Sequence, residues 1–175
     1  MRKPIIPPET FELIPILFLR FAEVLQACEL TVPELLTLMH LRTSGHIRNG
    51  RRIERRVDVA EFLGHVLIKN NSDAGISKFL DHMVEQKLIE KTSLTSKELK
   101  DWYDQEKGYK HGLIMTRRGD ERLTTFEQEV NQRLMSKFPP PLRSAMTRVI
   151  PMATKFLRTE YGTSKTTAAR NEPTK

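Results

Sequence analysis

The side chains in this sequence that are best suited to bind a partner are arginines. Residues 42–56 contain six arginines and one acid, Glu54. Clustered guanidinium groups bind the phosphates of nucleic acids, and a net charge of +7 with a pI of about 9.7 permits a polyanionic partner. The run is equally consistent with a basic loop that only keeps the chain soluble. The four arginines that we select as candidate phosphate contacts are Arg51, Arg52, Arg55 and Arg56.

No pattern in the sequence indicates catalysis. The motifs G-x-S-x-G, H-E-x-x-H and the phosphate-binding P-loop are absent. Asp58 and Glu61 have the spacing of a helix capping box, which accounts for both carboxylates without chemistry. The five histidines lack the spacing of metal ligands. We therefore expect no enzymatic activity, no catalytic residue, no metal site and no cofactor.

The single cysteine and the apolar runs bear on the cellular compartment. Cys28 excludes an internal disulfide framework, and its place on an apolar helix favours a buried structural thiol over a redox sensor. The longest apolar stretches, such as residues 13–19, are far shorter than the ~20 residues that span a bilayer. The N-terminal residues lack the features of a signal peptide. We expect a cytoplasmic protein without a membrane partner.

Hydrophobic periodicity predicts a mostly helical chain. The spacing predicts helices over 10–29, from Thr31, from Asp58, from Ser72, after Thr116 and over 141–160. Two short strands are expected at 88–91 and 111–116, with an extra helical turn at 96–103 in the polar segment between them. Residues 42–56 are expected to form a loop. The order helix, helix, helix, strand, long turn, strand, helix is the plan of a winged helix-turn-helix.

Three segments resemble signatures of the MarR family of bacterial transcription regulators. The run from Gly75 to Lys91 (GISKFLDHMVEQKLIEK) is similar to the recognition helix and the strand that follows it. The run from Leu113 to Gly119 (LIMTRRG) is similar to the segment after the wing, and the run from Leu30 to Glu34 (LTVPE) is similar to a helix start. The resemblance covers about residues 10–160. Lys78 stands where the family has arginine, Lys87 where it has glycine, and the wing lacks the family's Asp-x-Arg motif.

The resemblance implies a mostly α fold, namely a winged helix-turn-helix with a two-stranded β wing and N- and C-terminal dimerisation helices. It also implies a homodimer on double-stranded DNA with a palindromic operator, and a pocket for a small aromatic ligand. The expected parts are a flexible arm at 1–9, a dimerisation helix at 10–30, a DNA-binding lobe at 31–116, dimerisation helices at 117–160 and a disordered tail at 161–175.

The helix beginning near Ser72 is the best candidate for reading DNA. A recognition helix contacts bases with residues near its N-terminus while its apolar side packs on the body of the protein. Small side chains allow close approach, and hydroxyl and ammonium groups bond bases or phosphates. The DNA-binding residues that we predict here are Asn70, Asn71, Ser72, Asp73, Ala74, Gly75, Ser77, Lys78 and His82. In the wing we add Lys107 and Lys110.

Two other functions stay open at this stage. The missing Asp-x-Arg motif fits a winged-helix protein-interaction module without DNA binding. The same fold also serves replication or chromosome-organising DNA-binding proteins. Salt-dependent binding to random duplex DNA would separate the first of these from a DNA-binding protein, because phosphate contacts give a steep salt dependence.

Overall fold

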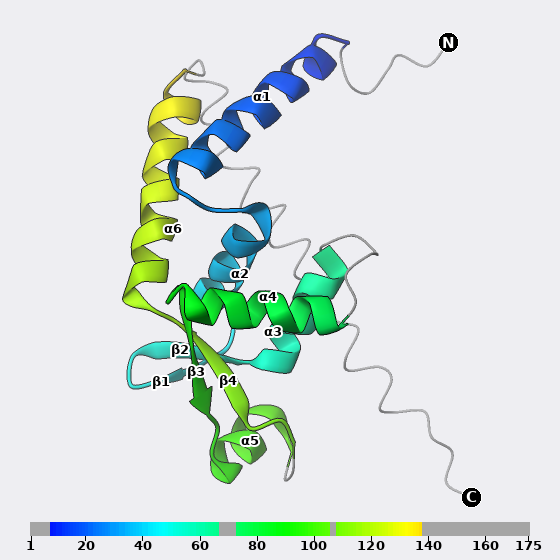
Figure 1. Cartoon of the computed structure of the whole chain (residues 1–175), viewed down its shortest axis with the longest axis vertical. Helices are drawn as coiled ribbons and strands as arrows, with labels where there is room; N and C mark the ends of the chain where they lie inside the picture. The colour runs from blue at the N-terminus through cyan, green and yellow to red at the C-terminus, as the bar shows by residue number, and fades with distance from the viewer. Residues whose placement is uncertain (1–7, 67–72, 106–107, 138–175) are drawn as a thin grey trace, which may run out of the picture. The chain divides into compact units, whose positions relative to one another are not determined.

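The computed structural model describes residues 8–66, 73–105 and 108–137 (Figure 1). The α-helices of this part are α1 (Pro8–Ala27), α2 (Val32–Thr43), α3 (Arg56–Val66), α4 (Asp73–Glu85), α5 (Ser96–Tyr103) and α6 (Arg117–Glu129), and a π-helical turn (Val130–Leu134) and a 3-10 turn (Met135–Lys137) follow. The strands are β1 (His46–Arg48), β2 (Arg51–Arg55), β3 (Ile89–Ser93) and β4 (His111–Met115). The mostly helical fold and the wing strands are as expected, and the predicted extra turn in the wing is the complete helix α5.

The sheet is larger than the two-stranded wing that the sequence predicts. Its four antiparallel strands have the order β1-β2-β4-β3, with Lys91 of β3 and Glu54 of β2 flanking Leu113 of β4. The expectation of a loop over 42–56 is therefore wrong, because β1 and β2 form a hairpin there. The hairpin turns at Asn49 and Gly50, whose positive φ angles of 53° and 77° match the tight turn that suits twisted strands.

Two apolar clusters hold these elements together. The main cluster lies among the helices and the base of the wing, and its fully buried members include Leu38, Leu41, Leu63, Leu80, Met83 and Leu123. The second cluster lies inside the wing and consists of Ile53, Leu94, Leu99 and Ile114, with Trp102 and Tyr103 packed against it. The wing thus has a small core of its own instead of being a bare hairpin.

Helix starts follow the expected capping chemistry at two of three places. The Thr31 hydroxyl accepts a hydrogen bond from the Glu34 N–H while the Glu34 carboxylate accepts one from the Thr31 N–H, which confirms the capping box of α2. Thr116 caps α6 as predicted. The predicted box at Asp58 is wrong, since α3 begins earlier, at Arg56, and the Asp58 carboxylate binds Arg55 instead.

The chain divides into two compact units, residues 1–130 and 131–175. In the first unit, α1 packs against α6 through the edge-to-face rings of Phe21 and Phe126, whose centroids are 5.6 Å apart. In Figure 1, α1 and α6 extend to one side of the sheet and α5 lies on the other side. The second unit is described only to Lys137, so the helix predicted at 141–160 and the tail predicted at 161–175 lie outside the described residues.

Candidate nucleic-acid interface

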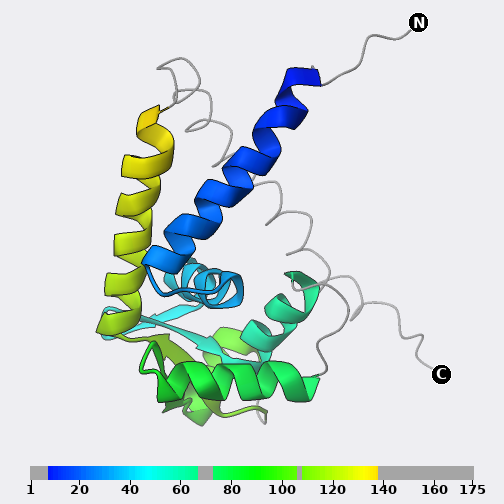
Figure 2. The same cartoon turned by 45° about the horizontal axis from the view of Figure 1, so that its top comes forward.

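Helix α4 has one buried side and one side open to solvent. Ile76, Leu80 and Met83 are buried in the main cluster, with Phe79 half-buried beside them. Ser77 and Lys78 are exposed, as are the first residues of the helix, Asp73, Ala74 and Gly75. Figure 2 shows α4 running along the outside of the lobe, with α2 and α3 on its inner side. The N-terminal half of α4 therefore presents exposed side chains, as a recognition helix does.

A network of charged groups fixes the middle of α4. Arg56, at the start of α3, donates to the Asp81 carboxylate at 2.8 Å and to the Ser77 hydroxyl at 2.8 Å and carbonyl at 2.9 Å. Lys91 of β3 approaches the same Asp81 oxygen at 2.7 Å. The hydrogen bonds from Arg56 and then Lys91 hold the pKa of Asp81 well below its ordinary value. Asp81 is therefore an anion neutralised within the protein, and the Ser77 hydroxyl already has a partner.

The arginines of residues 42–56 are mostly cross-links between elements. Arg42 binds Asp120 and Glu127 of α6 at 2.7 and 2.8 Å. Arg51 pairs with Glu90 of β3 at 2.6 Å. The remaining pairs with carboxylates are Arg48–Glu98, Arg55–Asp58 and Arg56–Asp81.

Arg52 differs from the other five arginines. It is exposed, and within the described part of the chain its guanidinium donates a hydrogen bond to the Gly45 carbonyl at 3.4 Å. Of the four arginines predicted to contact phosphates, it is the one with no carboxylate partner in the described part of the chain. The structure thus adds to the two earlier hypotheses a third role for the run, that of tying the lobe together.

The other predicted DNA-binding residues are placed as follows. His82 is exposed near the C-terminal end of α4, where its ring lies 2.9 Å from the Gln86 side chain. Lys110 is exposed at the end of the segment that leads into β4. The predicted residues outside the described part of the chain are Asn70, Asn71, Ser72 and Lys107. The structure thus brings together Arg56, Ser77 and Asp81, and leaves Lys78 exposed close by.

Sequence reasoning missed the contacts that shape the wing. Arg48 of the hairpin binds Glu98 of α5, and Arg55 lies over the ring of Tyr103, 4.1 Å from its centroid. Two local signals point to these elements. Asn49-Gly50 is a strong hairpin signal, and Thr95 with Glu98 has the spacing of a capping box, which the structure contains.

Other possible sites have less support in the structure. Cys28 is buried, as expected for a structural thiol. A hollow of about 240 Å³ is lined by Glu29, Gln86, Leu88, Arg118 and Arg122. In the described residues, no group of three or more His, Cys, Asp or Glu side chains is placed to hold a metal ion. None of the described helices combines the length and apolar character needed to cross a bilayer.

Solved structures share this fold. No family model matches the sequence, and no curated protein matches it. The crystal structure of RV1404 from Mycobacterium tuberculosis matches with a TM-score of 0.55 at 16% identity, over 89% of this chain and 97% of that chain.

Two further structures are similar at lower scores. AbsC, a MarR family transcriptional regulator from Streptomyces coelicolor, matches with a TM-score of 0.49 at 15% identity, over 86% and 90% of the two chains. A MepR like protein complexed with pseudoligands matches with a TM-score of 0.43 at 16% identity, over 85% and 90%. The order of the elements and the likeness to RV1404 confirm the winged-helix fold, and identities this low show the fold alone.

Proposed function

We propose that this protein is a DNA-binding transcription regulator of the MarR type, which binds a palindromic operator as a homodimer and places α4 in the major groove. The observation that carries the proposal is the division of α4 into a packed side and an exposed side. The side buried through Leu80 and Met83 anchors the helix, and the exposed side presents Lys78 near the N-terminal half. That is the arrangement by which a recognition helix reads base edges.

The first experiment is selection of binding fragments from the organism's own chromosome, followed by substitution of Lys78. Lys78→Ala should leave folding intact, because the side chain is exposed. It should weaken binding to the selected fragment by about 1–3 kcal/mol if Lys78 contacts a base. Binding to random DNA should weaken by less. Affinities are measured by titration with labelled duplexes.

The matched control removes a cation outside α4 and outside the proposed dimer surface of α1. Arg117→Ala at the start of α6 takes away the same charge from a side chain that is 93% exposed, so both variants change the net charge of the protein equally. Equal affinities for Lys78→Ala and wild type would mean that another surface faces the DNA.

The homodimer part of the proposal is supported by the exposed apolar side chains of α1. Ile16, Phe18 and Leu19 are 56%, 70% and 62% exposed. An apolar surface of this kind on a helix commonly marks a protein interface.

The proposed effector pocket is best matched by the hollow near the start of α6. Its lining of Arg118, Arg122, Glu29 and Gln86, with a single apolar side chain, Leu88, favours a ligand with an anionic group over a purely aromatic one. The Arg122 guanidinium already bonds the Glu29 carboxylate at 2.5 Å, so such a ligand would compete with that pair.

A second candidate function is a protein-interaction module. The charges on α4 favour it, since Asp73, Asp81 and Glu85 outnumber Lys78. Lys91 and Arg56 offset Asp81, so the α4 surface is close to neutral instead of basic. Binding to random duplex DNA at low salt, with a steep loss of affinity as salt rises, would decide for DNA binding. DNA binding without sequence preference would instead indicate a chromosome-organising or replication role.

A further inference from the structure

The wing of this protein has a helix where a simple wing has a turn. Helix α5 lies between β3 and β4 and packs on the hairpin β1–β2 through Leu99, which is fully buried, and through Trp102. The ring of Trp102 stacks on His46 of β1, with centroids 5.0 Å apart and planes 7° from parallel. The opposite surface of α5 carries exposed charges of both signs, namely the cations Lys97 and Lys100 and the acid Asp101.

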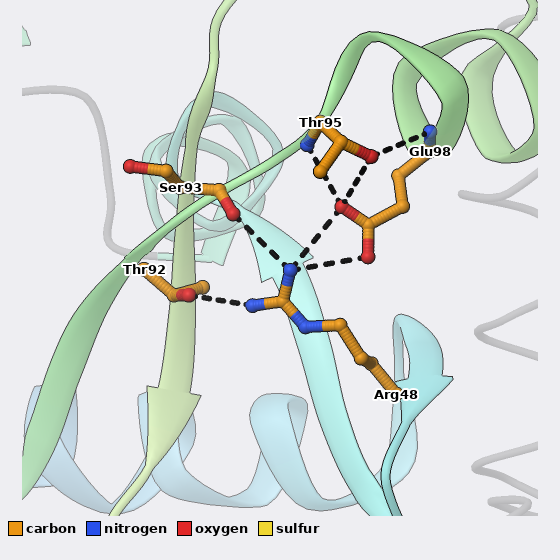
Figure 3. Close-up of polar contacts among 5 residues, drawn as sticks. All are labelled: Arg48, Thr92, Ser93, Thr95 and Glu98. Carbon is orange, nitrogen blue, oxygen red and sulfur yellow. Dashed lines mark hydrogen bonds and ion pairs between the residues drawn. The ribbon is translucent and has the colours of Figure 1, made fainter.

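Arg48 holds the N-terminal end of α5 (Figure 3). Its Nη1 donates to both Glu98 oxygens at 3.1 and 3.2 Å and to the Ser93 carbonyl at 3.2 Å. Its Nη2 donates to the Thr92 hydroxyl at 2.6 Å. Glu98 also accepts the Thr95 N–H at 2.8 Å, and this bond, with smaller effects from Arg48, lowers the pKa of Glu98. One guanidinium therefore connects the hairpin, β3 and the helix cap.

Arg55 holds the C-terminal end of α5. Its guanidinium lies 4.1 Å from the centroid of the Tyr103 ring, which is the distance of a cation–π contact. The same group donates to the Gln105 side chain at 2.8 Å. Two bonds of 2.6 and 2.8 Å to Asp58 of α3 fix its orientation, and both side chains of that pair are largely buried, 12% and 15% exposed.

We propose that Arg48 and Arg55 are positioning residues that fix α5 at both ends, so that the wing meets DNA as a rigid body carrying Lys97 and Lys100. The proposal rests on the proposed function as far as DNA is concerned. Its physical basis is preorganisation: an ordered binding segment loses less conformational entropy on association than a mobile one. The hairpin arginines then act through the position of the wing and need no contact with phosphate.

The test compares Arg48→Gln with Arg52→Gln, which removes a guanidinium from the same hairpin without touching α5. Amide hydrogen exchange of the free protein should show protection in α5 falling about 10-fold or more in Arg48→Gln and unchanged in Arg52→Gln. Glu98→Gln should reproduce the effect of Arg48→Gln, because glutamine keeps the helix cap and loses the ion pair. If Arg48→Gln does not fold, Arg48→Lys takes its place in the exchange experiment.

DNA binding gives the second measurement, on the fragment selected from the chromosome. Arg48→Gln should lose about 5- to 20-fold in affinity. Hydroxyl-radical protection should disappear at the edges of the footprint and stay at its centre. If Arg48→Gln only destabilised the protein as a whole, protection would weaken evenly over the whole footprint, and that result would overturn the proposal.

Two other results would also overturn it. Unchanged exchange in α5 of Arg48→Gln would show that the arginine does not hold the helix. Increased exchange with unchanged affinity and footprint would show that the wing does not contact DNA, while the proposed function survived. If the wild-type protein bound neither the selected fragments nor a random duplex of about 40 base pairs at low salt, the proposed function would fail, and the exchange experiment would still decide whether Arg48 orders α5.

Discussion

Glu54 is a buried acid at the junction of β2, α3 and α5. It accepts a bond from the Arg55 N–H at 3.2 Å and a long one, 3.4 Å, from the Tyr103 hydroxyl. Burial first, and then the charge of the neighbouring Asp58, raise the pKa of Glu54 from its ordinary 4.5 to about 7. The same surroundings raise the pKa of Tyr103, with burial as the main cause. The ionisable groups of α2 are engaged elsewhere, since Arg42 binds α6 and His40 stacks on Phe62.

Stability should therefore fall as pH rises from about 4.5 to 7. Below 4.5 Glu54 is protonated in both the folded and the unfolded chain. Above that pH the unfolded chain loses the proton first, which favours unfolding by up to about 3 kcal/mol once the folded-state pKa is passed. Urea unfolding of wild type and Glu54→Gln at pH 4.5, 6 and 7.5 measures the effect.

The variant supplies the control, because glutamine has the same shape and no proton to lose. The difference in unfolding free energy between Glu54→Gln and wild type should grow in favour of the variant across this window. Asp81, whose pKa is lowered, contributes stability that is lost as pH falls, and this loss occurs at more acidic pH than the Glu54 effect. It therefore does not obscure the comparison. A constant difference from pH 4.5 to 7.5 would mean that Glu54 ionises normally in the folded protein.

At the scale of single elements, the end of α4 shows how this sequence departs from the family pattern. Lys87 stands at the position of the expected glycine and adopts φ +59°, a left-handed conformation that costs a residue with a Cβ atom about 1 kcal/mol or more. The bonds Leu88 N–H to Met83 C=O and Lys87 N–H to Val84 C=O are those of a glycine-type helix end.

Lys87→Gly should therefore stabilise the protein by about 1 kcal/mol, because glycine adopts this conformation without strain. Lys87→Ala is the matched comparison, since it removes the long side chain and keeps the Cβ atom. It should give little or no gain in unfolding free energy. Equal effects of the two substitutions in denaturant titrations would show that the backbone angle is not the cause.

The sequence predicts the elements whose signals are local. Caps at Thr31 and Thr116, the apolar stripe of α4 and the two wing strands follow from spacing alone. The hairpin β1–β2 is not predicted because its arginine-rich strands lack the alternation of buried and exposed apolar residues. Ile53 is their one buried apolar side chain, and the buried residue next to it is the acid Glu54. The partners of the arginines are out of reach of sequence patterns, since Arg48 and Glu98 are 50 residues apart and meet only through the sheet.

At the scale of the whole molecule, the positive charge is unevenly distributed. Residues 1–137 contain 22 basic and 20 acidic side chains, whereas residues 138–175 contain 7 and 2. Most of the net charge of +7 therefore belongs to the C-terminal segment. Under the proposed function, non-specific attraction to DNA would depend on this surplus charge, while sequence reading would depend on groups placed against bases, for which Lys78 is the candidate. The two proposed contributions would then lie in different parts of the chain.

The proposed homodimer can be tested on α1. Phe18 is 70% exposed, so Phe18→Glu should leave the stability of the lobe unchanged while placing a charge in the apolar interface. Loss of a central aromatic contact costs about 2–4 kcal/mol in protein interfaces, which weakens self-association by roughly 30- to 1,000-fold. Analytical ultracentrifugation at micromolar concentration measures the change.

Gln26→Glu, also exposed on α1, adds the same charge without removing an apolar group and should remain dimeric. Binding to a palindromic fragment should fall with the dimer, since two half-sites need two copies of α4. A wild-type protein that sediments as a folded monomer at this concentration would refute the dimer, and with it the palindromic operator.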